Sequence, residues 1–343
     1  MKIDFVLPWV DSSDKIWQKQ KESFLPKSNN DMDNDTGELR YRDTHTLKYL
    51  LRSIEQNCPW YNKIFIITQG HKPKWIDSNN NKVVFVTHQE LYFDHTHLPT
   101  FNSSSIEMNL ANLKGVSEYF VYLNDDFLIM NSLDKKRFFV DNQPVDFLMH
   151  GWLPRGKIYQ ALRDNSSWVK ALNNNISLLN TVYKPSDITN KKDILFHHTY
   201  PLKNKLSNWL LLHIYKRYFF ISHWHNAQPY RMSTIKEVYS KFTKDMMVCS
   251  RNKFRADNDL TQYLYRYYHL TKGEFYPYYF DDNYKANITS IESLESIIND
   301  INLLKPNFVS IYDNYNPKKH TKIVAKLTEF LESKFPQKAS FEK

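Results

Sequence analysis

Residues 119–126 read YFVYLNDD, an apolar run that ends in an asparagine and two adjacent aspartates. Such a run predicts a strand, Tyr119–Leu123, that is buried on both faces of a sheet. Three further apolar strands are predicted before it, at Ile3–Val10, Lys63–Thr68 and Lys82–Thr87. Between the first two, Thr44–Asn57 carries leucines at helical spacing. This alternation predicts an α/β fold with a mainly parallel central sheet covered by helices.

The chain divides into three parts by composition and pattern. Residues 1–143 hold the alternating strands and helices. Residues 144–283 are rich in aromatic residues and histidines, with helical patterns at Ser167–Leu179 and Leu206–Arg217, so we expect an inserted helical subregion there. Residues 284–343 contain a predicted strand, Asn307–Ile311, and an amphipathic helix, Lys319–Lys334, which we expect to complete the α/β core.

Composition narrows the class of protein. The 343 residues carry a net charge of +9, which favours a phosphate-bearing partner, but no run of five basic residues indicates nucleic-acid binding. The only cysteines, Cys58 and Cys249, lack metal-ligand spacing and fit a reducing compartment. No GxxxxGK[ST] or GxGxxG motif occurs, which argues against a P-loop kinase and a dinucleotide oxidoreductase.

The sequence also bears on where the protein acts. The longest apolar stretch, near Trp209–Ile214, is too short to span a bilayer. We expect a cytoplasmic protein, at most peripheral to the inner face of the membrane.

Acidic residues follow three of the predicted strands. Asp11 follows the first strand, Asp125 and Asp126 follow Tyr119–Leu123, and Asp313 follows the last strand. Ligands of parallel sheets bind beyond the carboxyl ends of the strands, and hard cations prefer carboxylate oxygens shared with substrate phosphates. We therefore predict that Asp125 and Asp126, with Asp313, bind Mg²⁺ or Mn²⁺. The alternative is that each aspartate only caps a helix or turn.

Histidines and arginines supply the other candidate groups. His225 is the candidate general base, and His223, two residues away, is the alternative that the sequence does not separate from it. Arg42 and Arg255 are candidate partners for phosphate oxygens, and Arg52 lies on the first helix where it could serve the same purpose. The alternative for each arginine is a surface charge held in an ion pair. Zinc is disfavoured because no ligand set has zinc-type spacing.

Several blocks of the sequence carry a resemblance to a known family. They are IDFVLPWVDSSD (Ile3–Asp14), RYRD (Arg40–Asp43), Leu50–Ile76, LPTFNSSSIE (Leu98–Glu107), YFVYLNDDFLI (Tyr119–Ile129), HWHNAQPY (His223–Tyr230), Phe254–Tyr268, FVSIYDN (Phe308–Asn314) and Phe330–Glu342. Together they resemble the Stealth family of sugar-1-phosphate transferases. That family includes bacterial capsular polysaccharide phosphotransferases and the catalytic part of the lysosomal-enzyme GlcNAc-1-phosphotransferase. Ser12 departs from the glycine usual in the first block, and His223–Tyr230 matches only loosely.

The resemblance implies a GT-A-like nucleotide-sugar transferase fold and a reaction at phosphorus. A hydroxyl of a glycan or phosphopolysaccharide acceptor would attack the sugar-bearing phosphate of a UDP-sugar, release UMP and form a phosphodiester. Under this reading residues 1–143 bind the nucleotide sugar through Trp9, Asp11, Asn102 and Arg52, and residues 144–283 bind the acceptor and supply His225. Two rival readings remain open: an ordinary glycosyltransferase that releases UDP, and a non-catalytic protein that binds polyanions.

Overall fold

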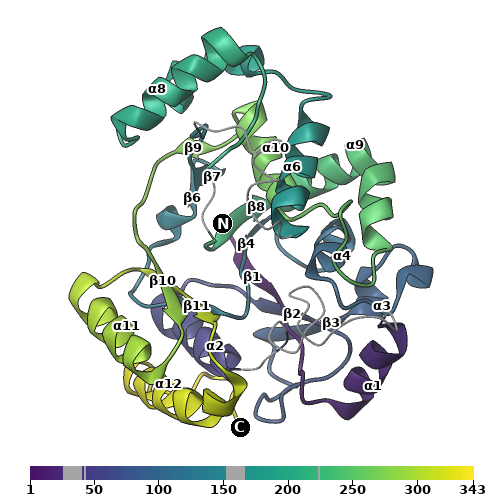
Figure 1. Ribbon diagram of the computed structural model, residues 1–343, viewed down its shortest axis with the longest axis vertical. Helices are drawn as coiled ribbons and strands as arrows, with labels where there is room; N and C mark the ends of the chain where they lie inside the picture. Colours follow the sequence, from purple (N-terminus) through teal and green to yellow (C-terminus); the bar gives the residue numbers. More distant parts are fainter. Residues whose placement is uncertain (26–40, 42–43, 152–166, 223–224) are drawn as a thin grey trace.

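The computed structural model describes residues 1–25, 41, 44–151, 167–222 and 225–343. Its central sheet has the strand order β3-β2-β1-β4-β8 (Figure 1). The strands are β1 (Ile3–Pro8), β2 (Ile64–Thr68), β3 (Val83–Thr87), β4 (Tyr119–Tyr122) and β8 (Gln228–Arg231). The first four are parallel and β8 runs antiparallel to β4. The predicted α/β class with a mainly parallel central sheet is confirmed.

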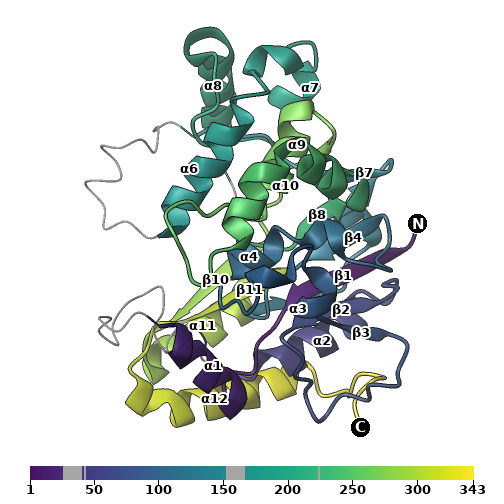
Figure 2. The same cartoon turned by 90° about the vertical axis from the view of Figure 1, so that its right-hand side faces the viewer.

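The two faces of this sheet are covered by different helices. Side chains alternate along each strand, so Phe5 and Leu7 of β1 pack into one core while Val6 packs into the other. Helix α2 (Thr46–Asn57) belongs to the first core, together with the C-terminal helices. Helices α9 (Met232–Ser250) and α10 (Tyr263–Lys272) belong to the second. Figure 2 shows these groups on opposite sides of the sheet.

The C-terminal part builds a second sheet beside the first. Strands β10 (Asn283–Ile288) and β11 (Phe308–Asp313) are parallel and are joined by helix α11 (Ile291–Leu304). The short strand β5 (Phe127–Ile129) pairs antiparallel with β11. The last strand, which we expected to complete the α/β core, lies in this separate three-stranded sheet between β10 and β5. Helix α12 (His320–Lys334) then packs on α11.

The remaining elements lie around these two sheets. They are α1 (Lys15–Phe24), α3 (His88–Leu91), α4 (Ser103–Glu107), β6 (Phe139–Val140), β7 (Gln143–Asp146), α6 (Ser167–Leu179), α7 (Lys192–Leu195), α8 (Leu202–Leu210) and β9 (Tyr276–Pro277). Strands β6, β7 and β9 form a small third sheet. Within the described ranges, no helix has the length and apolar character needed to cross a membrane.

Two helices differ from the sequence-based expectation. The pattern of Ser103–Leu113 predicts a single helix, but the helix ends at Glu107, and a short 3-10 turn at Leu110–Asn112 follows it. There the side-chain amide of Asn109 donates to the carbonyl of Ser105 at 2.9 Å, which takes an acceptor that a continuing helix would use. Helix α8 starts at Leu202 and passes into a π-helical turn, Leu211–Tyr215.

Arg52 anchors the end of the chain to helix α2. Its guanidinium donates to both carboxylate oxygens of Glu342, at 2.6 and 2.9 Å, and to the carbonyl of Phe335 at 2.8 Å. The same group lies 3.1 Å from both oxygens of Glu332 on α12. The side chains of Arg52 and Glu342 are only 2% and 4% exposed. Arg52 therefore acts as a structural clamp between α2 and the C-terminal segment, a correction to its expected place in the donor pocket.

We predict that Arg52→Ala lowers the free energy of unfolding by about 3–5 kcal/mol, because it leaves the buried carboxylate of Glu342 without its cation. Urea denaturation measures this difference. Lys326→Ala is the matched control, since it breaks a more exposed pair with Glu295 and should change stability by less than about 1 kcal/mol. Equal effects of the two substitutions would contradict the structural role assigned to Arg52.

Candidate functional site

The loop between β4 and β5, residues 123–126, lies where the two large sheets meet. Strand β8 pairs with β4 so that Gln228 lies opposite Tyr122, which brings the residues just before β8 beside this loop. On the other side, the N–H of Ile311 in β11 donates to the carbonyl of Asp126 at 2.9 Å. The end of β11 therefore reaches the same loop. Strand pairing thus gathers residues from three distant parts of the sequence.

His225 is held next to this loop by both of its ring nitrogens. Its Nε2 is 2.8 Å from the side-chain amide nitrogen of Asn124, and its Nδ1 is 2.7 Å from the hydroxyl of Tyr312. Burial lowers the pKa of His225 to about 4, and the positive charge of Lys285 acts in the same direction. The imidazole is therefore neutral at pH 7. With Nε2 accepting from Asn124, Nδ1 carries the proton and donates to Tyr312.

Asp126 and Asp313 form a pair of like charges at the same place. Burial raises the pKa of Asp126 to about 7, and the negative charge of Asp313 adds to the effect. Oδ1 of Asp126 is shielded from solvent and has no hydrogen-bond partner among the described residues. Burial raises the pKa of Tyr312 to about 12, and the negative charge of Asp126 adds to this effect. Because the hydroxyl of Tyr312 also contacts His225, Asp126 and His225 are neighbours. An uncompensated buried carboxylate suits a cation-binding position.

Asp125 lies in the same loop, and its backbone helps to hold the loop in place. Its backbone carbonyl accepts a hydrogen bond from Thr46 Oγ1 at 2.9 Å, which fixes the loop on helix α2. Among the described residues, no group of three His, Cys, Asp or Glu side chains is arranged to hold a metal ion. The pair Asp126 and Asp313 still fits Mg²⁺, because this ion is usually bound by one or two carboxylates plus water and substrate phosphates.

Asp11 and Trp9 follow β1 at the same edge of the central sheet. Oδ1 of Asp11 accepts from the backbone N–H of Ser13 at 2.9 Å and from its hydroxyl at 2.6 Å, so this oxygen closes a turn. The N–H of Asp11 donates to His71 Nε2 at 2.9 Å. Trp9 is buried in the core and meets the ring of His71 edge-on, with centroids 5.3 Å apart. Trp9 and Asp11, which were assigned to the donor, therefore both contact His71, Trp9 through its ring and Asp11 through its backbone N–H.

Asn102 and Arg255 lie together at the start of α4. Asn102 is fully buried; its Oδ1 accepts from the N–H of Ser104 as a helix cap, and its Nδ2 donates to Asp259 at 2.9 Å. This geometry makes Asn102 a residue that positions α4. The guanidinium of Arg255 is 3.3 Å from the hydroxyl of Ser103, while its Nε is buried without a hydrogen-bond partner among the described residues. Arg255 therefore retains donor capacity for an anion.

A pocket of about 450 Å³, open to solvent, borders the segment that directly follows His225. Its lining includes Arg137, Phe147, Asn226, Gln228, Arg266, Tyr278, Phe280 and Asn283. The side-chain amide nitrogen of Asn283 is 3.3 Å from the carbonyl of His225, which connects the pocket to the base. Oδ1 of Asn283 is buried and has no hydrogen-bond partner within the described ranges.

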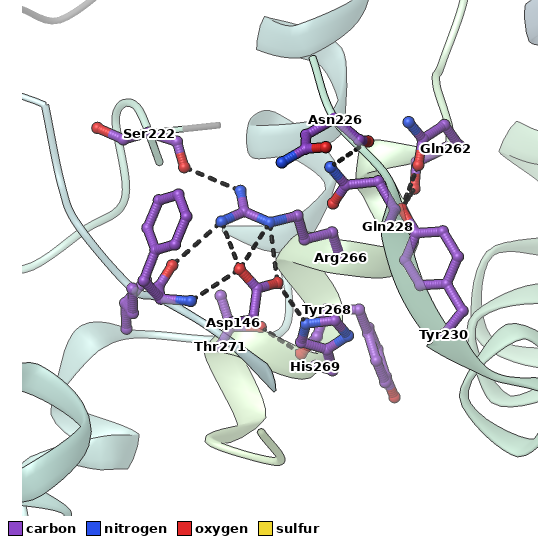
Figure 3. A network of polar contacts seen from close by, with 12 residues as sticks. Asp146, Ser222, Asn226, Gln228, Tyr230, Gln262, Arg266, Tyr268, His269 and Thr271 are labelled. Carbon is purple, nitrogen blue, oxygen red and sulfur yellow. Dashed lines mark hydrogen bonds and ion pairs between the residues drawn. The ribbon is translucent and has the colours of Figure 1, made fainter. Parts of the chain in front are cut away.

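The charges around this pocket are already paired. Figure 3 shows Arg266 of α10 donating to both carboxylate oxygens of Asp146, at 2.7–3.0 Å, with His269 Nε2 2.9 Å from the same carboxylate. Burial raises the pKa of Asp146, but Arg266 and His269 outweigh it and hold this pKa below its ordinary value. Arg137 is paired with Asp282 at 2.9 Å. The pocket is thus polar, with both guanidinium charges compensated, and it includes two aromatic rings 4.3 Å apart, Tyr278 and Phe280.

The remaining candidates lie outside the site or outside the described residues. Arg42 and His223 fall in segments that the structure does not describe. The sequence-based reasoning missed Asn124, Tyr312, His71 and Asn283. Asn124 and Tyr312 directly precede the aspartates that were selected, so the signal that marked those aspartates also marked them. His71 and Asn283 had no such signal.

The chain is similar to proteins of known sequence and structure. The chain is similar in structure to the galactosyltransferase LgtC, with a TM-score of 0.41, 10% sequence identity, and coverage of 96% of this chain and 95% of the other. The Stealth protein conserved region 1 matches residues 1–29, and conserved region 2 matches residues 40–146.

Relatives match over the whole chain. The capsular polysaccharide phosphotransferase WcwK of Streptococcus pneumoniae is 34% identical over 343 residues, covering 100% of this chain and 98% of the relative. The exopolysaccharide phosphotransferase cps2G of Lactiplantibacillus plantarum is 31% identical over 344 residues, covering 99% and 96%. These matches confirm the resemblance found in the sequence, and the chain belongs to the Stealth family of capsular and exopolysaccharide phosphotransferases.

Proposed function

We propose that the protein transfers a sugar 1-phosphate from a UDP-sugar to a hydroxyl of a glycan acceptor in the synthesis of a capsular or cell-surface polysaccharide. The observation that carries this proposal is the juxtaposition of a neutral, buried His225 with the Asp126–Asp313 carboxylates, linked through Tyr312. A base and a cation-binding pair at one sheet edge are the groups that phosphoryl transfer to a hydroxyl needs.

In the proposed reaction the acceptor oxygen attacks the sugar-bearing phosphorus of the donor. A new oxygen–phosphorus bond forms, the bond from this phosphorus to the bridging oxygen breaks, and UMP leaves with that oxygen. His225 accepts the proton of the attacking hydroxyl at Nε2, where that hydroxyl takes the place of the Asn124 side-chain amide, while Nδ1 keeps its proton and its contact with Tyr312. A pKa of about 4 makes an isolated imidazole a weak base, but the negative charge of a bound donor phosphate would raise it toward neutrality.

Asp126 and Asp313, with Asp125 as a third candidate, would hold Mg²⁺ or Mn²⁺. The cation supplies charge neutralisation for the donor phosphates. Trp9 and Asp11 stay our proposed contacts for the nucleotide, because they follow β1, whose neighbour β4 leads into the aspartate loop. Arg255 stays a proposed phosphate partner because its Nε is buried without a described acceptor.

The pocket beside His225 is our proposed acceptor site. Its paired arginines leave little net charge for an anion to neutralise, whereas Asn226, Gln228 and the free acceptor Oδ1 of Asn283 match sugar hydroxyls. Aromatic rings give the apolar face of a sugar a surface to pack on. This placement assigns the 144–283 part to the acceptor, although its strand β8 belongs to the central sheet. The protein would act in the cytoplasm, peripheral to the inner face of the membrane.

The released nucleotide separates the proposal from its rivals. Incubation with a panel of UDP-sugars and an acceptor glycan should release UMP and give the ³¹P signal of a phosphodiester, because the bond broken lies between the two phosphates. Release of UDP without a new phosphodiester would show an ordinary glycosyltransferase. Salt-sensitive binding of polyanions with no nucleotide release would show a binding protein.

We predict that EDTA abolishes transfer and that Mg²⁺ or Mn²⁺ restores it. Asp126→Asn should lose most activity while the melting temperature stays within a few degrees of wild type. Asp245→Asn, an exposed substitution on α9, is the control and should leave activity unchanged. Full activity in excess chelator would remove the cation from the proposal.

Stability should also depend on pH through Asp126. Its pKa is raised from 3.8 to about 7 in the folded protein, so between these values the folded state binds more protons than the unfolded state. Metal-free stability should therefore fall as pH rises through this window. Added Mg²⁺ should raise the melting temperature more at about pH 8 than at about pH 5. Asp126→Asn should weaken both the pH dependence and the response to Mg²⁺.

We predict that His225→Ala lowers turnover at least about a hundredfold, since general base catalysis contributes about 10²–10⁴. Donor affinity, measured by calorimetry, should be nearly unchanged. Tyr312→Phe should have a smaller effect, because it removes a group that orients His225 while leaving the base. His95→Ala, at an exposed histidine, is the control, and His223→Ala should cost clearly less than His225→Ala. Turnover of His225→Ala close to wild type would place the base elsewhere.

A further inference from the structure

Helix α8 has the reverse of the usual arrangement of polar and apolar side chains. Its buried residues are polar: Asn208 donates to the carbonyls of Leu148 and Leu195, and Ser207 donates to the carbonyl of His150, at 2.6–2.8 Å. Its outward face is apolar. Leu202, Leu206 and Trp209, which lie four and three residues apart and so share one side of the helix, are 83%, 49% and 46% exposed.

The apolar face continues beyond the end of α8. Ile214 and Tyr215, in the π-helical turn that follows, are 58% and 36% exposed. We call these five residues the α8 surface: Leu202, Leu206, Trp209, Ile214 and Tyr215. A cluster of large apolar side chains on one exposed element marks an interaction site more often than a random feature of a surface.

The charged residues next to the α8 surface in the sequence have one sign. Lys203 and Lys205 flank its first three members on the helix, and Lys216 and Arg217 follow Tyr215. From residue 194 to residue 236 the sequence contains no aspartate or glutamate. Figures 1 and 2 show α8 at the end of the molecule opposite α11 and α12, where a flat partner can approach it.

We propose that the α8 surface binds the protein to an anionic lipid bilayer, with the apolar side chains among the headgroups and acyl chains and the basic side chains at the lipid phosphates. An apolar face bordered by lysine and arginine is the pattern of helices that lie in the membrane interface. A second copy of this chain fits less well, because two symmetry-related α8 surfaces would bring their positive charges together.

Co-sedimentation with vesicles tests this proposal. The wild-type protein should pellet with vesicles of mixed phosphatidylglycerol and phosphatidylcholine, and much less with phosphatidylcholine alone. The double substitution Leu206→Gln with Trp209→Gln should lower the binding constant at least about tenfold, since binding scales with the apolar area inserted. Lys203→Gln with Lys216→Gln should lower binding to the anionic vesicles and reduce its sensitivity to salt.

The control removes apolar side chains elsewhere that are more exposed than Leu206 and Trp209. Ile16→Gln with Leu303→Gln, at positions 81% and 80% exposed on α1 and α11, should bind vesicles like wild type. Equal loss in the control, wild-type binding by the α8 variant, or no binding by the wild type would each overturn the proposal. So would a wild-type dimer in sedimentation velocity that the α8 substitutions dissociate. UMP release in vesicle-free solution should be the same for the α8 variant and wild type, which separates this outcome from a failure of the proposed reaction.

Discussion

The structure depends on a four-residue connection, residues 123–126, that belongs to both large sheets. It ends β4 in the central sheet and leads directly into β5 in the second. Hydrogen bonds to its backbone carbonyls hold it on two sides: the side-chain hydroxyl of Thr46 donates to Asp125 and the N–H of Ile311 donates to Asp126. Because the backbone groups are satisfied in this way, the side chains of the loop are left for His225 and for ligands. The pairing of β8 with β4 and of β11 with β5 then places His225 and Asp313 beside this loop.

This arrangement carries an electrostatic penalty. A carboxylate that is buried beside another, and of which one oxygen has no hydrogen-bond partner among the described residues, favours its protonated form, as the raised pKa of Asp126 indicates. Some other buried ions of the chain are paired, for example Arg266 with Asp146 and Arg52 with Glu342. Burial also raises the pKa of Glu107 to about 7, but both of its oxygens accept hydrogen bonds, from the hydroxyl of Tyr122 and the N–H of Gln262. Asp126 differs because its Oδ1 has no such donor among the described residues. Local violations of the rule that buried charges are paired are typical of functional sites.

The sequence predicted the elements whose own residues carry the signal. Continuous apolar runs marked β1 to β4, and the aspartates after them marked the edge of the sheet where Asp126 and Asp313 now lie. Strands β5 and β8 were missed because they are three and four residues long and depend on partners far along the chain. Arg52 was misplaced for the same reason: the sequence shows its charge, but its partner Glu342 lies 290 residues away. Asn102 was chosen from its block, and only the structure shows that its amide caps α4 and binds Asp259.

The pairing of β5 with β11 also constrains how the chain is made. The side chains of β5 are apolar and fully enclosed in the finished protein, yet the strand that covers its edge is translated roughly 180 residues later. At about 5–20 residues per second, β5 leaves the ribosome roughly 10–40 s before its partner. During that interval helix α2, which is made earlier, can already pack against β5 and hydrogen-bond the backbone of Ile129, but the edge that β11 covers stays open. An unpaired apolar strand edge is a site of aggregation, so the nascent chain carries a defined segment for chaperones to shield until β11 is made.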